Sequence, residues 1–251
     1  MSYALLQTEI EKPSADALQK AFKVLSELVD LDADSLSNDG YGIIVRDLSR
    51  ENAEQLAQAV NGQGISVEAV DECELVKLPP PKKLRRIDCL PDGLVLYDTL
   101  GRPETVDWSH VVMAGAGFVA STEAKRVEKT RVVIRQTGMQ GGAFPIFLTD
   151  VSVKLEHKSR LVLDIFLDIA PGRVQLYAHK GQYNYLGDRL HTRYMNNFAT
   201  LVQDLAEFAT NAQLNRGADS LRSDNTVTFL YPNRHAYEEE LIWLFWEKAR
   251  A

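Results

Sequence analysis

The amino-acid sequence predicts an α+β protein made of two modules. In the first 75 residues, segments with the composition of strands alternate with segments that carry apolar residues at helical spacing. From residue 84 to residue 180 the pattern changes to one strand after another, separated by turns. A stripe of apolar residues from Leu190 to Ala212 then predicts one amphipathic helix of about 24 residues.

The composition is that of a globular chain, with 45% hydrophobic and 25% charged residues. No apolar run approaches the roughly 20 residues of a membrane-spanning helix, and no basic leader or signal peptide opens the sequence. Cys73 and Cys89 form no C-x-x-C motif, which suits a reducing compartment, although a disulfide between them stays open. We therefore expect a cytoplasmic protein without a membrane span.

The net charge of −7 is unevenly distributed along the chain. Residues 1–78 carry 6 Lys and Arg against 15 Asp and Glu, whereas residues 79–217 carry 18 against 14. The overall balance lacks the basic excess of a nucleic-acid-binding surface, so no nucleic-acid partner is expected. The middle segment either presents a local basic patch or, in the favoured interpretation, faces the acidic module within the molecule.

The first module, residues 1–75, has its elements in the order β-α-(β)-β-α-β. Helices are expected after the N-cap residues Ser14 and Ser49, and the acidic segment 30–40 leaves room for a short edge strand. The remaining strands are expected at 3–10, 41–46 and 65–70. This order of elements resembles a ferredoxin-like fold, which by itself selects no function.

Residues 76–83 are the expected linker, because three consecutive prolines at positions 79–81 can continue neither a strand nor a helix. The second module, residues 84–214, resembles the pleckstrin-homology-like superfold, in which antiparallel strands are closed by one long helix. Its strands are expected at 84–90, 94–97, 105–114, 130–135, 146–155, 160–169 and 173–180. Residues 215–251 add a strand at 226–230 and a helix at 234–250.

A glycine pair in the segment 111–120 fits the dinucleotide-binding pattern G-x-G-x-x-A after a strand. Three features weigh against nucleotide binding: residues 121–129 are mostly charged, no acidic residue ends the next strand, and no strand–helix alternation follows. The favoured interpretation is that Gly115 and Gly117 relieve a bend or bulge in a sheet. The loop 137–145 is expected to be a hairpin tip, because its glycines, Gly138, Gly141 and Gly142, lack the G-K-[ST] ending of a phosphate-binding loop.

Asp164 and Asp168 are expected on one face of a half-buried strand, about 13 Å apart. A glycosidase pair needs about 5–9.5 Å, so we favour a solvated face paired with Arg160 or Arg173 across the strands. None of the five histidines has the spacing of a metal-ligand pair. The sequence therefore predicts no catalytic, cofactor-binding or metal-binding residues.

Two basic clusters are candidates for binding an anion: Lys82, Lys83, Arg85 and Arg86 in the first, Lys125 and Arg126 in the second. The resemblance to pleckstrin-homology-like folds implies only a region, because such folds hold anionic headgroups or phosphopeptides near the ends of early strands. The favoured alternative is a solvated face or an intramolecular partner for the acidic module.

The last predicted helix is apolar nearly all round, so something must bury it. Burial within the chain is the favoured interpretation. The alternative is a subunit interface formed by Trp243, Phe245 and Trp246.

The sequence thus predicts a non-catalytic binding or protein-interaction protein without a cofactor, whose partner is a protein or a small anionic ligand. Two alternatives stay open. One is a nucleotide-binding enzyme built around the turn Gly115-Ala116-Gly117, and the other is a structural subunit that self-associates through the C-terminal helix.

Overall fold

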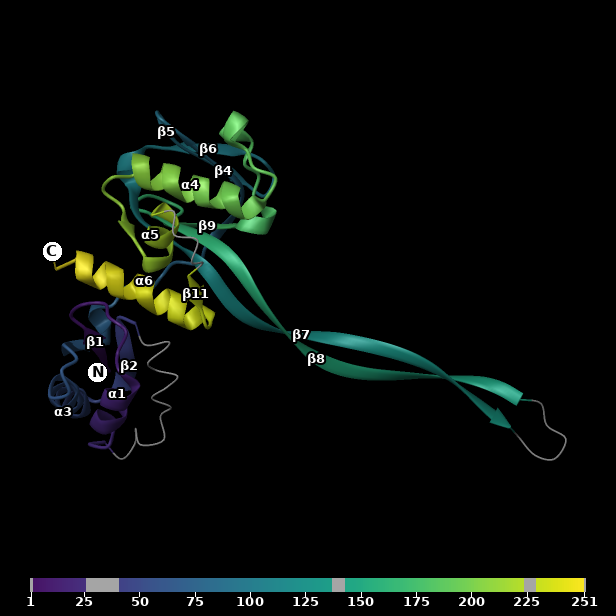
Figure 1. The fold of residues 1–251 in the computed structure, drawn as a ribbon, viewed down its shortest axis with the longest axis horizontal. Helices are drawn as coiled ribbons and strands as arrows, with labels where there is room; N and C mark the ends of the chain where they lie inside the picture. Colours follow the sequence, from purple (N-terminus) through teal and green to yellow (C-terminus); the bar gives the residue numbers. More distant parts are fainter. Residues whose placement is uncertain (1, 26–40, 137–142, 224–228, 251) are drawn as a thin grey trace.

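The computed structural model describes residues 2–25, 41–136, 143–223 and 229–250, and it gives no side-chain description for 122–151 and 153–157. Helices accompany one antiparallel sheet and one mixed sheet, which confirms the α+β class. The N-terminal module, the larger module and a long two-stranded ribbon are distinct in Figure 1, with the C-terminal helix between the two modules.

The N-terminal module contains a three-stranded sheet in the order β2-β1-β3. Its elements are β1 (Tyr3–Gln7), α1 (Ala15–Phe22), β2 (Ile43–Leu48), α3 (Arg50–Asn61) and β3 (Val67–Asp71). β1 runs antiparallel to both neighbours, and the Ser49 hydroxyl accepts a hydrogen bond from the backbone N–H of Asn52, as an N-cap does. The edge strand expected in 30–40 lies outside the described residues, and the ferredoxin-like assignment stays a prediction.

The larger sheet has the strand order β10-β7-β8-β9-β4-β5-β6. Its strands are β4 (Lys82–Leu90), β5 (Gly93–Asp98), β6 (Pro103–Val106), β7 (Val111–Gln136), β8 (Ala143–Leu167), β9 (Arg173–Tyr177) and β10 (Gln213–Leu214). The expected antiparallel arrangement is wrong for three pairs, because β4 runs parallel to β9, and both β10 and β11 (Leu230–Tyr231) run parallel to β7. The expected strand 105–114 is broken by a 3-10 turn, Trp108–His110, at which Asp107 accepts the Ser109 N–H. The pleckstrin-homology-like assignment stays a prediction.

The helix α4 (Tyr194–Phe208) packs on this sheet and is shorter than the apolar stripe suggested. Leu190 lies outside the helix and is half exposed. The Asn197 side chain explains the late start, because it accepts the His191 N–H at 2.6 Å and donates to the His191 carbonyl at 2.9 Å. These two bonds hold the preceding segment in a turn, which an apolar stripe cannot reveal.

β7 and β8 form one continuous antiparallel ribbon of 26 and 25 residues. The separate strands expected at 105–114, 130–135, 146–155 and 160–169 are therefore wrong in their boundaries. The charged segment 121–129 is part of β7, since a hairpin pairs through its backbone and needs no apolar period when no sheet covers it. Of the loop expected at 137–145, residues 143–145 belong to β8 instead, and the rest lies outside the described residues.

The C-terminal segment contains α5 (Arg216–Arg222), β11 (Leu230–Tyr231) and α6 (Arg234–Lys248). Trp243 and Trp246 of α6 are buried in a cluster that includes Leu6 from the N-terminal module and Phe166 from β8. The Trp243 indole N–H also donates to the Gln7 carbonyl at 2.7 Å. The chain itself therefore buries both tryptophans, and α6 joins the two modules. Most of the strand expected at 226–230 lies outside the described residues.

Alkaline pH is expected to unfold the protein cooperatively. Burial raises the pKa of Tyr183, Tyr185, Tyr231 and Tyr237 above the usual value. The stability that these neutral phenols contribute is complete below the unfolded-state pKa of about 10, and it is lost as the pH rises above that value. Absorbance of phenolate at 295 nm should therefore rise together with the loss of helical circular dichroism. A complete tyrosine titration in a chain that keeps its helical signal would contradict this expectation.

Candidate functional site

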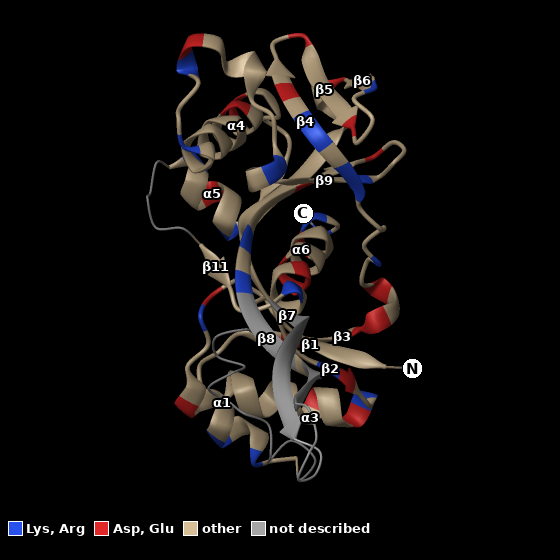
Figure 2. Ribbon diagram, turned by 90° about the vertical axis from the view of Figure 1, so that its right-hand side faces the viewer, with Lys and Arg blue, Asp and Glu red and all other residues tan. Residues whose placement is uncertain are grey.

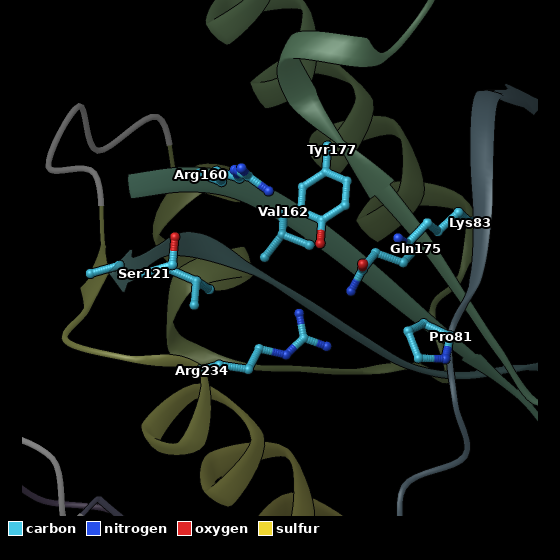
Figure 3. A pocket seen from close by; sticks show the side chains of 10 residues that line it. Pro81, Lys83, Ser121, Arg160, Val162, Gln175, Tyr177 and Arg234 are labelled. Atoms are coloured by element: carbon cyan, nitrogen blue, oxygen red, sulfur yellow. The ribbon is translucent and has the colours of Figure 1, made fainter. Parts of the chain in front are cut away.

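A cavity of about 340 Å³ lies where the β7–β8 ribbon leaves the larger module (Figure 3). We call it the root cavity. Its wall comes from four strands, the linker before β4 and the start of α6. The polar lining residues are Lys83 from β4, Ser121 from β7, Arg160 from β8, Gln175 and Tyr177 from β9, and Arg234 from α6. Apolar surface comes from Pro81, Val119, Ala120 and Val162.

The strand register explains how these residues come together. Val162 of β8 pairs directly with Tyr177 of β9, and Lys83 of β4 pairs with Gln175 of β9. Side chains alternate between the faces of a sheet, so Val162, Asp164 and Phe166 share one face of β8. We expected Asp164 on a solvated face, which is wrong, because α6 covers this face and Asp164 is fully buried.

Below the root cavity, Asp164 is the centre of a buried polar network. Its carboxylate accepts hydrogen bonds from Arg173 Nε at 2.8 Å, Gln175 Nε2 at 3.0 Å and the Tyr237 hydroxyl at 2.9 Å. The sequence had suggested Arg173 as its cross-strand partner, and the structure has this pair. Asp168, by contrast, is exposed, and its carboxylate lies 2.8 Å from Nδ1 of His110.

The network continues from Arg173 to the cavity wall through Glu238. Arg173 Nη2 donates to Glu238 Oε1 at 2.9 Å, and Arg234 Nη2 donates to the same oxygen at 2.8 Å. Burial would raise the pKa of Glu238, but the neighbouring Arg234 and Arg173 outweigh it, so that this pKa lies below its usual value. Ionised Glu238 therefore lies between the guanidinium groups of Arg173 and Arg234 and accepts a hydrogen bond from each.

The electrostatic character of the root cavity is positive. Among the described residues its lining contains no Asp or Glu, and three cations face it from Lys83, Arg160 and Arg234. The Arg160 guanidinium carbon lies 6.0 Å from the Tyr177 ring centroid. Figure 2 shows further Lys and Arg positions in blue along β4. The arrangement is suited to an anion that carries an apolar body.

Among the anion-binding candidates named from the sequence, Lys83 alone lines the root cavity. Lys82 pairs with Glu104 at 2.8 Å, and Arg86 makes two bonds to Asp88. Arg85 is exposed and does not line the cavity. Lys125 and Arg126 belong to β7 beyond the cavity, where side chains are not described.

Sequence reasoning missed Gln175, Tyr177 and Arg234 as site residues, and it assigned Arg160 only to a cross-strand pair. Each lies on a different part of the chain from Lys83, so no local motif joins them. One signal was present: Val162 and Phe166 on the supposedly solvated face of β8 are apolar, which indicates a covering element.

The glycines of the nucleotide-like pattern make room for side chains of the same chain. A Cβ atom on Gly115 would lie 2.5 Å from Leu241 Cδ2, and one on Gly117 would lie 2.5 Å from Tyr231 Cε2. Gly117 also has φ +157°. The expected bend or bulge is not at these positions; the irregularity in pairing falls between Val111 and Met113. The glycines instead allow β11 and α6 to approach β7 closely.

In the described part of the chain, no three His, Cys, Asp or Glu side chains gather as a metal-binding group, and no helix has the length and apolarity to cross a membrane. Cys73 is exposed and Cys89 is buried, and both are free thiols. Burial raises the pKa of the Cys89 thiol, so it is a poor nucleophile.

The chain was compared with protein families, curated proteins and solved structures. No model of a protein family matches the chain, and neither a curated protein nor a solved structure matches it.

Proposed function

We propose that this chain is a non-catalytic binding protein that holds a small anionic ligand in the root cavity. One observation carries the proposal: Lys83, Arg160 and Arg234 face a largely apolar cavity whose described lining contains no carboxylate. A ligand with one anionic group and a compact apolar body supplies the opposite charge and covers the apolar wall.

The buried network supports an anion over a cation as the ligand. Asp164 and Glu238 already accept hydrogen bonds from Arg173, and Glu238 also accepts one from Arg234. Neither carboxylate belongs to the cavity lining. Because Glu238 compensates Arg234, a bound cation would meet Lys83 and Arg160 and, among the described lining residues, no carboxylate. The cavity volume of about 340 Å³ fits a ligand of the size of a substituted benzoate.

The polar contacts of the cavity support binding without catalysis. Ser121 is a hydroxyl nucleophile in the wall, but its Oγ donates to the Lys158 carbonyl at 3.2 Å. The described lining contains no His, Asp or Glu to act as its general base. Leu241 and Tyr231 occupy the space above Gly115 and Gly117, where a nucleotide-dependent enzyme would place a pyrophosphate. This also favours a binding protein.

Thermal shift and calorimetry with benzoate, phenyl phosphate and benzamide test this proposal. Benzoate or phenyl phosphate is expected to raise the melting temperature at saturating concentration, and the two probes distinguish a carboxylate ligand from a phosphate. Benzamide has the same ring without the charge and is expected to give no shift. Equal stabilisation by benzamide, or no shift with either anion, would overturn the proposal.

The variant Lys83→Gln/Arg160→Gln is expected to weaken binding of the stabilising anion about 10-fold to 100-fold. A hydrogen bond to a charged group contributes about 1.5–3 kcal/mol, and each 1.4 kcal/mol is a factor of ten. Neither residue contacts Glu238, so the buried network should stay intact. Arg193→Gln is the matched control, because Arg193 is exposed and lies outside the cavity. An equal loss of affinity in the control would argue for non-specific attraction to the chain's surface.

A further inference from the structure

The β7–β8 ribbon continues far beyond the strands that support it (Figure 1). β9 pairs with β8 only from Val162 to Phe166, and β11 pairs with β7 only at Phe118 and Val119. β7 and β8 nevertheless stay in register to Gln136 and Ala143. We call residues 121–136 and 143–158 the arm. Along the arm, the described residues include no third strand on either edge.

An isolated arm of this kind is poorly stable in water. Two paired strands without a third strand or a covering helix are marginal, and their outer edges expose unpaired backbone N–H and C=O groups. At about 3.3 Å per residue, the 16 residues from 121 to 136 extend for about 50 Å. Contacts from another molecule along these edges would stabilise a ribbon of this length.

The register also brings charged residue types together along the first part of the arm. Glu123 pairs directly with Glu156, Lys125 with Lys154, and Lys129 with Asp150. Nearer the tip the register pairs apolar residue types: Val132 with Phe147, Val133 with Ile146, and Ile134 with Pro145. The arm thus combines charged positions near its root with apolar positions near its tip.

Charge indicates which partner fits the arm. Residues 121–158 contain seven Lys and Arg against four Asp and Glu, whereas residues 1–78 contain 6 against 15. Figure 2 shows Asp and Glu positions in red on the N-terminal module, including the segment after β3. On this module Glu9 and Glu11 are exposed beside a hollow of about 250 Å³ that Ile65 and Pro13 also line. The module therefore offers acidic and apolar surface together.

We propose that the arm binds a second copy of this chain and lies on the acidic N-terminal module of that copy. Each copy carries both surfaces, so two reciprocal contacts close a two-fold dimer in which each arm contacts the other subunit. The overall charge of −7 and the apolar residues near the tip favour a protein partner over a nucleic acid. This proposal is independent of the root cavity and of its ligand.

Shortening the arm tests the proposal directly. Ser121 and Lys158 are direct register partners, so residues 122–157 can be replaced by Asn-Gly, which favours a tight two-residue hairpin turn. Light scattering at high micromolar concentration is expected to give a dimer for the full chain and a monomer for the shortened chain. The shortened chain should keep its helical circular dichroism and its thermal transition, because the replaced residues 122–157 lie beyond the positions at which β9 and β11 pair with the ribbon. A monomeric full chain, or a shortened chain that remains a dimer, would overturn the proposal.

A charge-reversal pair then tests the surface on the other subunit. Lys125→Glu/Arg126→Glu/Lys129→Glu is expected to weaken the dimer at least about tenfold at low salt, and this difference should shrink as salt screens the charges. A mixture with Glu9→Lys/Glu11→Lys should recover part of the lost affinity. A reversed arm that dimerises as tightly as the original would exclude charge complementarity and overturn the assignment of this surface. Binding of benzoate or phenyl phosphate should be unchanged in both variants, so failure here is distinct from failure at the root cavity.

Discussion

Arg173→Met is expected to lower the free energy of unfolding by about 3–5 kcal/mol, because it leaves Asp164 buried without its counter-charge. Asp164 is fully buried and Arg173 is 2% exposed, so water cannot replace the missing guanidinium. Glu238 keeps its bond from Arg234, and the loss should therefore arise mainly at Asp164. Urea denaturation followed by circular dichroism measures the change.

Two further variants separate charge burial from lost packing. Asp164→Asn removes the negative charge but keeps an oxygen that accepts from the Tyr237 hydroxyl. The double variant Arg173→Met/Asp164→Asn should therefore be more stable than Arg173→Met alone by at least about 1 kcal/mol. Arg222→Met is the exposed control, since its pair with Asp219 is half exposed and pairs of this kind contribute less than about 1 kcal/mol. Additive losses in the double variant would contradict the role assigned to the buried charge.

The alternation of apolar and polar residues in a strand predicts only part of the network around Asp164. Alternation along 160–169 predicts one apolar face made of Leu161, Leu163, Ile165, Leu167 and Ile169; the first four are buried, whereas Ile169 is exposed. Of the two partners that the sequence suggested for the aspartates, Arg160 and Arg173, it is Arg173 that pairs with Asp164. It could not place α6 over the opposite face, because α6 follows β8 by more than sixty residues and nothing local connects them. For this reason the sequence predicted neither the burial of Asp164 nor the root cavity.

The sequence did not predict the long β7–β8 ribbon, for a different physical reason. The charged residues 121–129 have neither a helical nor an alternating apolar period, and their strand conformation comes from pairing with residues 150–158. Pairing of this kind depends on register, which composition does not encode. The candidate site shows the same limit, because Lys83, Arg160 and Arg234 come from three elements that converge only in the folded chain.

Gly217→Ala is expected to destabilise the protein by at least about 3 kcal/mol, although alanine is the better helix former. A Cβ atom on Gly217 would overlap the carbonyl oxygen of Ala116, well inside the sum of their van der Waals radii. That oxygen belongs to the backbone of β7, so no side-chain rotation relieves the clash. Either α5 or β7 must move.

The hydrogen bonds around Asn215 make this movement costly. The Asn215 side chain accepts from the Ala116 N–H at 2.8 Å and from the Ala218 N–H at 2.9 Å, and it donates to the Ala116 carbonyl at 3.1 Å. Separation of α5 from β7 breaks these bonds in a fully buried place. Gly217→Ala therefore destabilises the protein in two ways: through overpacking and through the loss of these hydrogen bonds.

Gly64→Ala separates this clash from backbone strain. Gly64 has φ +84°, and no atom lies within 4 Å of its added Cβ, so that only the left-handed conformation costs energy, about 1–2 kcal/mol. Calorimetric melting of both variants should show a drop for Gly217→Ala well beyond that for Gly64→Ala, or no folded state at all. Equal melting temperatures would mean that α5 can move away from β7 at little cost. The hydrogen bonds of Asn215 would then not stabilise the contact between the C-terminal segment and the sheet.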